Sequence, residues 1–202
     1  QVEKNNITVK LNTEATRDAI LREKADAVIV AIGAEPIVPP IPGLEKHQNV
    51  LLAVDAYETP EKVGQKVVII GGGMVGCEAS LHFARMNKDV QVIEMGENLA
   101  PNSIFTDRSS TIYYMDQEPT LTYSLNTVCK EVTEAGIVII QEETETFLEA
   151  DTVILATGYR AREKAEFEHT AYDVIPVGDC QEASNIRNAI SGGHEAIWRI
   201  GI

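Results

Sequence analysis

A glycine-rich turn between an apolar strand and a helix constrains this chain more than any other feature. The apolar strand 66–70 leads into the turn 71–76, and residues 77–87 have the apolar spacing of a helix. Three glycines fit the spacing G-x-G-x-x-G: Gly71, Gly73 and Gly76. In such a turn the first glycine permits a tight bend, the second lets a pyrophosphate approach the backbone, and the third lets helix and strand pack closely. The order of strand, turn and helix therefore predicts a Rossmann-type dinucleotide site.

An acid at the end of the next strand indicates which dinucleotide is favoured. Strand 89–94 ends in Glu94, 18 residues after Gly76, where an acid accepts hydrogen bonds from the adenosine ribose in this kind of site. A 2′-phosphate would meet this carboxylate, and residues 95–98 contain no Arg or Lys to offset it. NAD(H) is therefore favoured over NADP(H). The alternative is a strand-to-helix turn without a ligand and an exposed Glu94.

Charge is distributed unevenly along the chain. The 202 residues carry a formal net charge of −14. Residues 66–150 hold 5 basic and 13 acidic side chains, a net charge of −8, although they contain the glycine turn. Phosphates bound there would have to be held by backbone N–H groups and the helix dipole rather than by a basic patch. The acid excess also argues against nucleic acid or an anionic membrane surface as a partner.

The cysteines and the apolar runs narrow the class of protein further. Three widely separated cysteines, Cys77, Cys129 and Cys180, give neither a disulfide framework nor a metal-ligand spacing. No apolar run approaches the ~18–20 residues that a membrane span needs. We therefore expect a reduced, cytoplasmic protein with no metal site. Cys77 is interpreted as a small packing residue and His194 as a capping or solvent-facing one.

Two apolar segments that end in glycine flank the segment with the glycine turn. Residues 26–33 and 151–158 both resemble strands of a parallel sheet covered on both faces. We therefore predict an α/β fold with two Rossmann-like three-layer units.

Local patterns give more specific expectations. Residues 7–11 alternate as a half-buried strand does, and residues 15–23 are expected to form a short helix with Thr13 as its cap. The apolar residues 136–140 and 146–148 predict a hairpin around an acidic turn.

Three motifs carry a resemblance to a known family: Val67–Glu78, Ile154–Tyr159 and Val177–Cys180. They are similar to the pyridine nucleotide-disulfide oxidoreductases, flavoproteins in which an NAD(P)H-binding domain is inserted into an FAD-binding domain. The resemblance implies that residues 66–150 are the inserted NAD(H)-binding domain, and that residues 1–65 and 151–202 form a partial, discontinuous FAD-binding-type domain. The amino-acid sequence of residues 26–43 and 186–193 most resembles that of the carboxyl-terminal half of the old yellow enzyme-like NADH:flavin oxidoreductases. That group includes bacterial 2,4-dienoyl-CoA reductases, bile-acid-inducible reductases and trimethylamine dehydrogenase.

The resemblance implies roles for residues near the NADH. The residues of its pyrophosphate turn are Gly71, Gly72, Gly73, Met74, Val75 and Gly76. Glu94 matches the acid that binds the ribose, and Glu78 matches a glutamate that lies near the nicotinamide end in relatives.

Two further motifs are implied to belong to the FAD side. Residues Ala156, Thr157 and Gly158 match the segment where the chain returns from the NADH domain to the FAD domain. Gly178 and Asp179 match the motif whose aspartate contacts the ribityl–phosphate region of FAD. At the first crossing between the domains, Ile32 stands where the family usually has Thr.

The resemblance also implies that this chain is a fragment of a longer enzyme. The family's FAD domain opens with its own glycine turn, which Gln1 and the residues after it do not supply. The FMN barrel, the cysteines of an Fe–S cluster and the substrate site would lie further upstream. We therefore expect the chain alone to bind NADH better than FAD, with the missing amino-terminal half as its partner. An oligomer is compatible with the sequence.

In the intact enzyme, electrons would pass from NADH through FAD to the barrel flavin, which would reduce an activated C=C bond such as that of an enoyl or dienoyl thioester. No catalytic residue is assigned on this chain. Three alternatives stay open: a reductase part from another two-dinucleotide-domain flavoprotein subfamily, a nucleotide-binding module without catalysis, and a dimerisation or docking scaffold.

Overall fold

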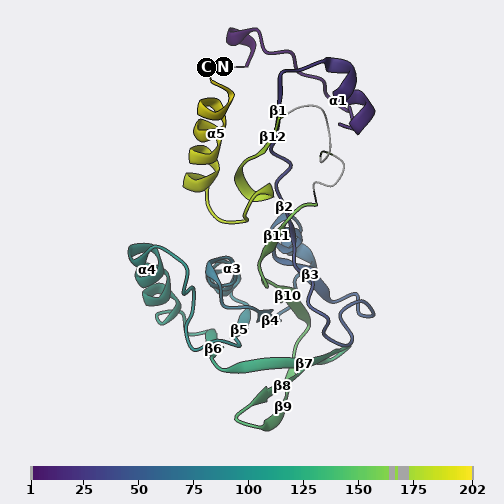
Figure 1. The fold of residues 1–202 in the computed structure, drawn as a ribbon. Helices are drawn as coiled ribbons and strands as arrows, with labels where there is room; N and C mark the ends of the chain where they lie inside the picture. Colours follow the sequence, from purple (N-terminus) through teal and green to yellow (C-terminus); the bar gives the residue numbers. More distant parts are fainter. Residues whose placement is uncertain (1, 164–166, 168–172, 202) are drawn as a thin grey trace. The chain divides into compact units, whose positions relative to one another are not determined.

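The computed structural model describes residues 2–163, 167 and 173–201. The chain divides into two compact units (Figure 1). Unit 1 consists of residues 1–35 and 159–202, and unit 2 consists of residues 36–158. Unit 1 is thus discontinuous along the chain, whereas unit 2 is continuous.

Unit 2 is built on a five-stranded parallel sheet. In spatial order its strands are β3 (Val50–Leu52), β10 (Thr152–Leu155), β4 (Lys66–Ile70), β5 (Asp89–Ile93) and β6 (Leu121–Ser124). β4 is the central strand, and the chain passes from it to β5 and β6 on one side while β10 returns on the other. In an open α/β sheet, such a change of direction marks the place where ligands bind, outside the carboxyl ends of the strands.

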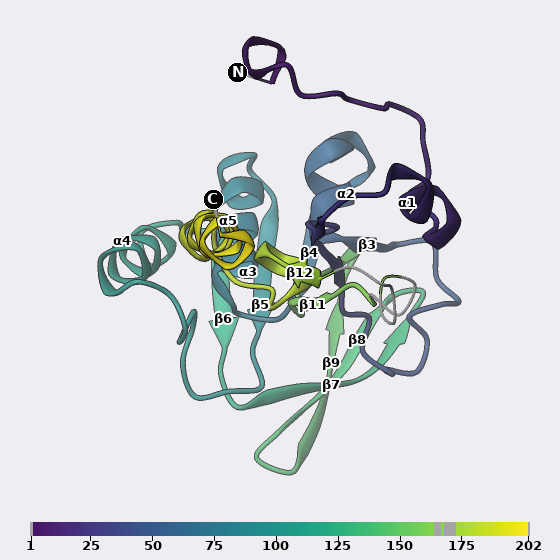
Figure 2. The same ribbon diagram turned by 45° about the horizontal axis from the view of Figure 1, so that its top comes forward.

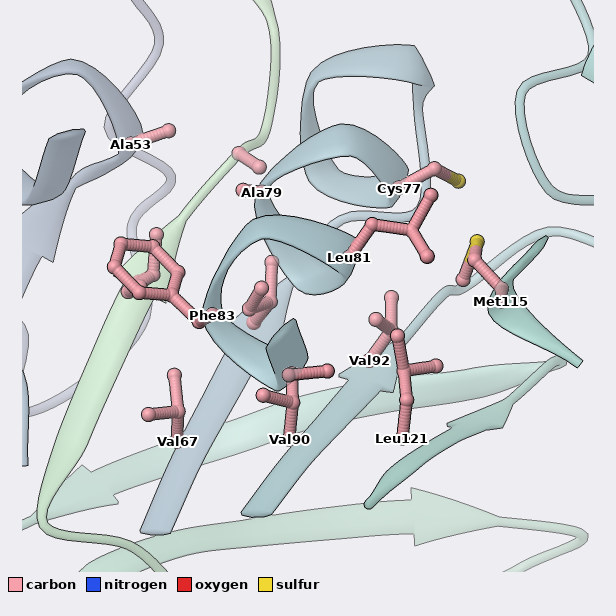
Figure 3. Packing of buried hydrophobic residues seen from close by; sticks show 14 of the residues in the cluster. Ala53, Val67, Cys77, Ala79, Leu81, Phe83, Val90, Val92, Met115 and Leu121 are labelled. Carbon is pink, nitrogen blue, oxygen red and sulfur yellow. The ribbon is translucent and has the colours of Figure 1, made fainter. Parts of the chain in front are cut away.

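Helices cover one face of this sheet. The helices of this unit are α2 (Ala53–Glu58), η2 (Pro60–Lys62), α3 (Met74–Arg85) and α4 (Phe105–Met115). The side chains between α3 and the strands form a tightly buried cluster (Figure 3). Phe83, Val92 and Ile154 in this cluster have no exposed surface. Seven of the twelve residues of α3 are buried, because the helix presents a broad apolar face to the sheet.

A three-stranded antiparallel sheet covers the other face (Figure 2). It consists of β7 (Thr127–Thr133), β8 (Gly136–Gln141) and β9 (Thr144–Glu149). Val132 and Ile137 of this sheet share a buried cluster with Val68 and Val153 of the parallel sheet. The predicted hairpin is confirmed as β8 and β9, and unit 2 has the three layers expected of a Rossmann-like unit.

Unit 1 contains small pieces of sheet with helices beside them. Its elements are η1 (Glu3–Asn5), α1 (Arg17–Glu23), β1 (Ala27–Val30), β2 (Ala34–Pro36), β11 (Tyr159–Ala161), β12 (Asp173–Pro176), η4 (Gly178–Cys180) and α5 (Ile186–Ile200). β1 pairs in parallel with β12, and β2 pairs with β11. Val30 and Cys180 are buried together in a small core.

Two local expectations for unit 1 are wrong. Residues 7–11 form no strand, and the side chains of Ile7, Val9 and Leu11 are exposed. The alternation is present, but none of the described strands pairs with these residues, and an unpaired strand is not stable.

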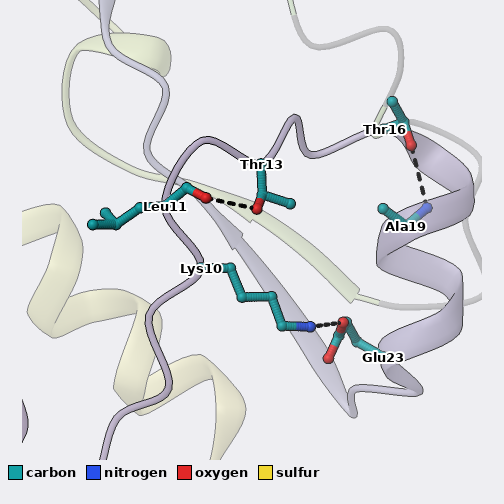
Figure 4. Close-up of polar contacts among 6 residues, drawn as sticks. All are labelled: Lys10, Leu11, Thr13, Thr16, Ala19 and Glu23. Atoms are coloured by element: carbon teal, nitrogen blue, oxygen red, sulfur yellow. Dashed lines mark hydrogen bonds and ion pairs between the residues drawn. The ribbon is translucent and has the colours of Figure 1, made fainter.

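The second correction concerns the helix cap. Thr16, not Thr13, caps α1, because the Thr16 hydroxyl accepts a hydrogen bond from the N–H of Ala19 at 3.3 Å (Figure 4). Thr13 instead donates to the carbonyl of Leu11 at 3.0 Å. Lys10 forms an ion pair with Glu23 at the end of the helix. The helix itself is therefore present, but it starts later than the apolar pattern alone suggests.

The limits of the two units differ from the domain boundaries predicted from the sequence. Residues 36–65 and 151–158 group with unit 2 because β3 and β10 are hydrogen-bonded strands of its sheet. Sequence patterns reveal the strands but not which sheet each one joins, which depends on pairing between segments far apart in the chain. No helix in the described parts of the chain is long and apolar enough to cross a membrane.

The cluster beneath α3 predicts where unit 2 is most sensitive to substitution. Val92→Ala removes two methyl groups from a side chain with no exposed surface, and should lower the free energy of unfolding by roughly 2 kcal/mol. Val128→Ala makes the same change on β7 where the side chain is 47% exposed, and should cost less than about 0.5 kcal/mol. Urea unfolding followed by circular dichroism measures both values, and equal losses would contradict this assignment of the core.

Candidate functional site

The glycine turn lies at the carboxyl end of the central strand β4. Gly71 follows Ile70 directly, and its N–H donates to the carbonyl of Ile93 on β5 at 2.9 Å. The turn leads straight into α3, for which Gly73 is the N-cap. The predicted strand, turn and helix are therefore all present, and they lie where the strand order changes direction.

The three glycines of the turn are needed for different reasons. Gly71 has φ +107°, and a Cβ there would come within 2.5 Å of the Ala156 carbonyl oxygen. A Cβ on Gly76 would come within 2.0 Å of the Gly71 carbonyl oxygen. A Cβ on Gly73 would meet no protein atom within 4 Å. Two glycines thus permit close packing, while the backbone at Gly73 faces open space.

The start of α3 can receive an anion beside this open space. The first N–H groups of any helix lack acceptors within the helix, and no side chain caps α3. The first bond of the helix joins the Cys77 N–H to the Gly73 carbonyl at 3.0 Å. The backbone donors of the first turn and the positive end of the helix dipole are therefore suited to a phosphate group.

Glu94 holds the turn against the loop that follows β5. One carboxylate oxygen accepts from the N–H of Gly72 at 2.6 Å, and the other accepts from the N–H of Gly96 at 2.7 Å. An ionised carboxylate has about four acceptor positions, so two backbone bonds leave capacity for hydroxyl groups of a ligand. The sequence predicts a ribose-binding acid here, and the structure adds that the same carboxylate joins two loops.

Residues 98–100 form a loop that contacts the glycine turn, and the sequence does not identify this loop as part of the site. The N–H of Ala100 donates to the Gly72 carbonyl at 2.7 Å. Leu99 is buried, and its Cδ2 would lie 2.6 Å from a Cβ on Gly72. Arg108 on α4 donates from Nε to the Leu99 carbonyl at 2.7 Å. Arg108 lies on a later helix, outside residues 95–98 that follow Glu94 directly, so the spacing in the sequence gives no sign of this contact.

The return segment also contacts the glycine turn. The N–H of Ala156 donates to the carbonyl of Ile70 at 2.9 Å, and the Ala156 carbonyl packs against Gly71. The Thr157 hydroxyl donates to the Ile37 carbonyl at 2.6 Å, and the Ile37 N–H donates to the Gly158 carbonyl at 2.9 Å. The structure thus brings residues 156–158 together with the glycine turn.

Glu78 and the motif at Gly178 and Asp179 take no part in this set of contacts. Glu78 is exposed on α3, and its charge adds to the effect of burial in raising the pKa of Tyr57 on α2. Gly178 and Asp179 belong to unit 1, where Asp179 Oδ1 accepts from the Ser184 N–H at 3.3 Å. The roles of these three residues toward a cofactor stay predictions.

All three cysteines are buried and unpaired with one another. The Cys77 thiol donates to the Gly72 carbonyl at 3.4 Å. Burial chiefly raises the pKa of this thiol to about 11, and the charge of Glu94 adds to the effect. A thiol with so high a pKa is a poor nucleophile, which favours the packing role. No metal-binding group of His, Cys, Asp or Glu is found among the described residues.

Comparison with known proteins gives a family match over most of the chain. The family model for pyridine nucleotide-disulphide oxidoreductases matches residues 1–188. Cinnamate reductase of Clostridium sporogenes is 28% identical over 199 residues, covering 96% of this chain and 29% of the relative. Bilirubin reductase of Mediterraneibacter gnavus is 32% identical, covering 94% of this chain and 30% of the relative.

A solved structure agrees with these matches. A 2-naphthoyl-CoA reductase in complex with 2-naphthoyl-CoA superposes with a TM-score of 0.84 at 28% identity, covering 96% of this chain and 30% of that one. The chain therefore spans about 30% of the length of each of these relatives.

The raised thiol pKa predicts how stability depends on pH. In the unfolded chain the Cys77 thiol ionises near pH 8.5, while in the folded chain it stays protonated to about pH 11. Between these values the folded state binds more protons, so the free energy of unfolding falls as pH rises. Urea unfolding at about pH 8 and pH 10 should show a smaller fall for Cys77→Ala than for the wild-type chain. An identical fall would contradict the buried, protonated thiol.

Proposed function

The chain belongs to the pyridine nucleotide-disulphide oxidoreductase family, and on that basis we propose that unit 2 binds NAD(H) within a longer flavin-dependent reductase. The observation that carries the proposal is the open backbone at Gly73. Its neighbours Gly71 and Gly76 are closely packed, yet the space beside Gly73 contains no protein atom within 4 Å. A space next to uncapped helix N–H groups and a held carboxylate suits a pyrophosphate with its ribose.

Each part of the ligand has a proposed partner on this chain. The backbone of residues 73–76 would hold the pyrophosphate, and Glu94 would accept hydrogen bonds from the adenosine ribose. Glu78, about one turn into α3, would lie toward the nicotinamide end, as the family resemblance implies. Bound NADH supplies a hydride, and the protein supplies the binding and orientation.

Glu94 is the reason for proposing NADH rather than NADPH. Its carboxylate is fixed by two backbone N–H groups, so it cannot turn away from a 2′-phosphate without breaking those bonds. Residues 95–98 supply no positive charge. Repulsion between two anions would therefore weaken the binding of NADPH.

We propose that the substrate site and the second cofactor site are completed by a further part of the parent protein. The relatives are about three times as long as the matched region. Unit 1 also exposes large apolar side chains that a further segment could cover: Ile29, Ile186, Ile190, Ile197 and Trp198. FAD near Gly178 and Asp179, and FMN and an Fe–S cluster upstream, stay predictions from the resemblance.

The proposed reaction of the whole enzyme is NADH-dependent reduction of an activated C=C bond in an enoyl or dienoyl thioester. Two relatives support this class by name, since cinnamate is an unsaturated acid and 2-naphthoyl-CoA an aromatic thioester. Other relatives are named for bilirubin and metal reduction. The NADH site described above is compatible with all of these acceptors.

Substitution of individual glycines tests the proposed pyrophosphate site. Gly73→Ala should lower the melting temperature only slightly, because the space is open and the main cost is that alanine is a poorer N-cap than glycine, but it should weaken NADH binding at least about ten-fold, or about 1.4 kcal/mol. Gly193→Ala is the matched control, because a Cβ there also meets no atom within 4 Å but lies on α5 in unit 1. Gly76→Ala should destabilise the fold by roughly 1–3 kcal/mol. Quenching of NADH or protein fluorescence measures binding, and equal affinity of Gly73→Ala and wild type would refute the site.

Substitution of Glu94 tests the choice of dinucleotide. Glu94→Gln replaces one acceptor oxygen with an amide NH₂ that would face a backbone N–H, so NADH should bind roughly ten-fold more weakly. NADPH should lose less affinity because the repulsion is removed, and the ratio of the two dissociation constants should approach one. Glu97→Gln, at an exposed neighbouring position, should change neither constant. An unchanged ratio for Glu94→Gln would rule out the role given to this acid.

The same titration separates the remaining candidate functions. A chain that binds NADH, and whose parent protein oxidises it with an added electron acceptor, is a reductase. Binding without oxidation by the parent protein would instead favour a nucleotide-binding module. If neither NADH nor NADPH binds in a saturable way, the dinucleotide proposal fails and a docking scaffold becomes the better explanation.

A further inference from the structure

Arg108 differs from three of the other four cations of residues 66–150, a segment that the structure describes throughout. Three of these cations form ion pairs with carboxylates: Lys66 with Glu149, Arg85 with Glu118, and Lys130 with Glu145. Lys88 donates to the carbonyls of Val63 and Gly64. Arg108 has no carboxylate partner within this segment, although 13 acidic side chains are available there.

The guanidinium of Arg108 instead holds the loop after β5. Its Nε donates to the Leu99 carbonyl at 2.7 Å, and its Nη2 donates to Asn98 Oδ1 at 3.4 Å. The side chain is half-buried. A planar guanidinium with fixed donor directions suits the bridging of two neighbouring oxygens. Arg108 therefore fixes the loop at two successive residues.

This loop is in turn bonded to the glycine turn. Ala100, next to Leu99, donates to the Gly72 carbonyl at 2.7 Å, and the Leu99 side chain packs against Gly72. Gly72 donates to Glu94, which also holds Gly96 at the start of the same loop. A continuous set of contacts thus joins Arg108 to Glu94.

The position of Arg108 on its own helix offers little benefit to that helix. Arg108 lies in the first turn of α4, where the helix dipole favours negative charge. A cation at this position gains nothing from the dipole, whereas its contact with the Leu99 carbonyl is short and partly buried. The contact with the loop is therefore the better explanation for an arginine here.

We propose that Arg108 is a positioning residue for the dinucleotide. It holds residues 98–100 against Gly72, and through Gly72 it keeps the Glu94 carboxylate where the adenosine ribose binds. Arg108 thereby sets the affinity for NADH and the preference over NADPH, although it lies 14 residues beyond Glu94 in the sequence. This inference rests on the proposed binding of NADH by unit 2.

The decisive measurement compares both dissociation constants in Arg108→Ala and the wild-type chain. NADH should bind about ten-fold more weakly, or about 1.4 kcal/mol, and NADPH by a smaller factor, so that the preference falls. Arg108→Lys, which can still donate to the Leu99 carbonyl, should regain part of the preference. Arg85→Ala removes an exposed guanidinium that pairs with Glu118, and should leave both constants unchanged.

A double variant tests whether Arg108 acts through Glu94. If it does, Arg108→Ala combined with Glu94→Gln should lose no more of the preference than Glu94→Gln alone, because both changes disturb one set of contacts. Additive losses of preference would overturn the inference. Equal weakening of NADH and NADPH by Arg108→Ala would also overturn it, since a general phosphate contact or a loss of stability has that effect.

The outcomes separate this inference from the proposed function. If the wild-type chain binds NADH and Arg108→Ala binds it equally well, only the role of Arg108 fails. If the wild-type chain binds neither dinucleotide, the proposed function fails and the inference fails with it. Melting temperatures of all variants identify any loss of binding that follows from unfolding.

Discussion

The carboxylate of Glu94 is the contact on which the candidate site depends. It accepts one hydrogen bond from the glycine turn at Gly72 and one from the following loop at Gly96. Hydrogen bonds to an ionised acceptor are stronger than those between neutral groups. The carboxylate therefore fixes the turn and the loop together before any ligand arrives. A site held in this way loses little conformational entropy when a ligand binds.

The rest of unit 2 places this carboxylate and the turn at the carboxyl ends of two neighbouring strands of the sheet. Adjacent parallel strands β4 and β5 end side by side, so Gly71 and Glu94 follow neighbouring strands. The buried layer beneath α3 keeps the helix start in position, and Phe83 and Val92 within it have no exposed surface. Close packing of this kind resists displacement. The helix N–H groups and the acid are therefore held together as one rigid candidate site.

Much of this fold could be predicted because its signals are local. The strand, turn and helix around Gly71–Gly76 follow from apolar spacing and from glycine positions. The alternation at residues 7–11 failed as a predictor because a strand needs a partner, and partners are set by the tertiary fold. The sequence predicts Thr13 rather than Thr16 as the cap because both are threonines near the same helix start. The sequence also does not predict which sheet β3 and β10 join, since sheet membership depends on pairing between distant segments.

The sequence alone determined the dinucleotide-type turn, the acid at the end of the next strand and the resemblance to the family that the comparisons support. Each of these depends on residues close together in the chain, whose spacing fixes their geometry. Only the tertiary structure decided that Gly73 faces open space while Gly71 and Gly76 are closely packed. It also decided that Arg108 reaches the Leu99 carbonyl beside the turn. The reason is physical: free space and long-range contacts depend on how separate segments pack against each other, and the spacing of residues along the chain does not determine this packing.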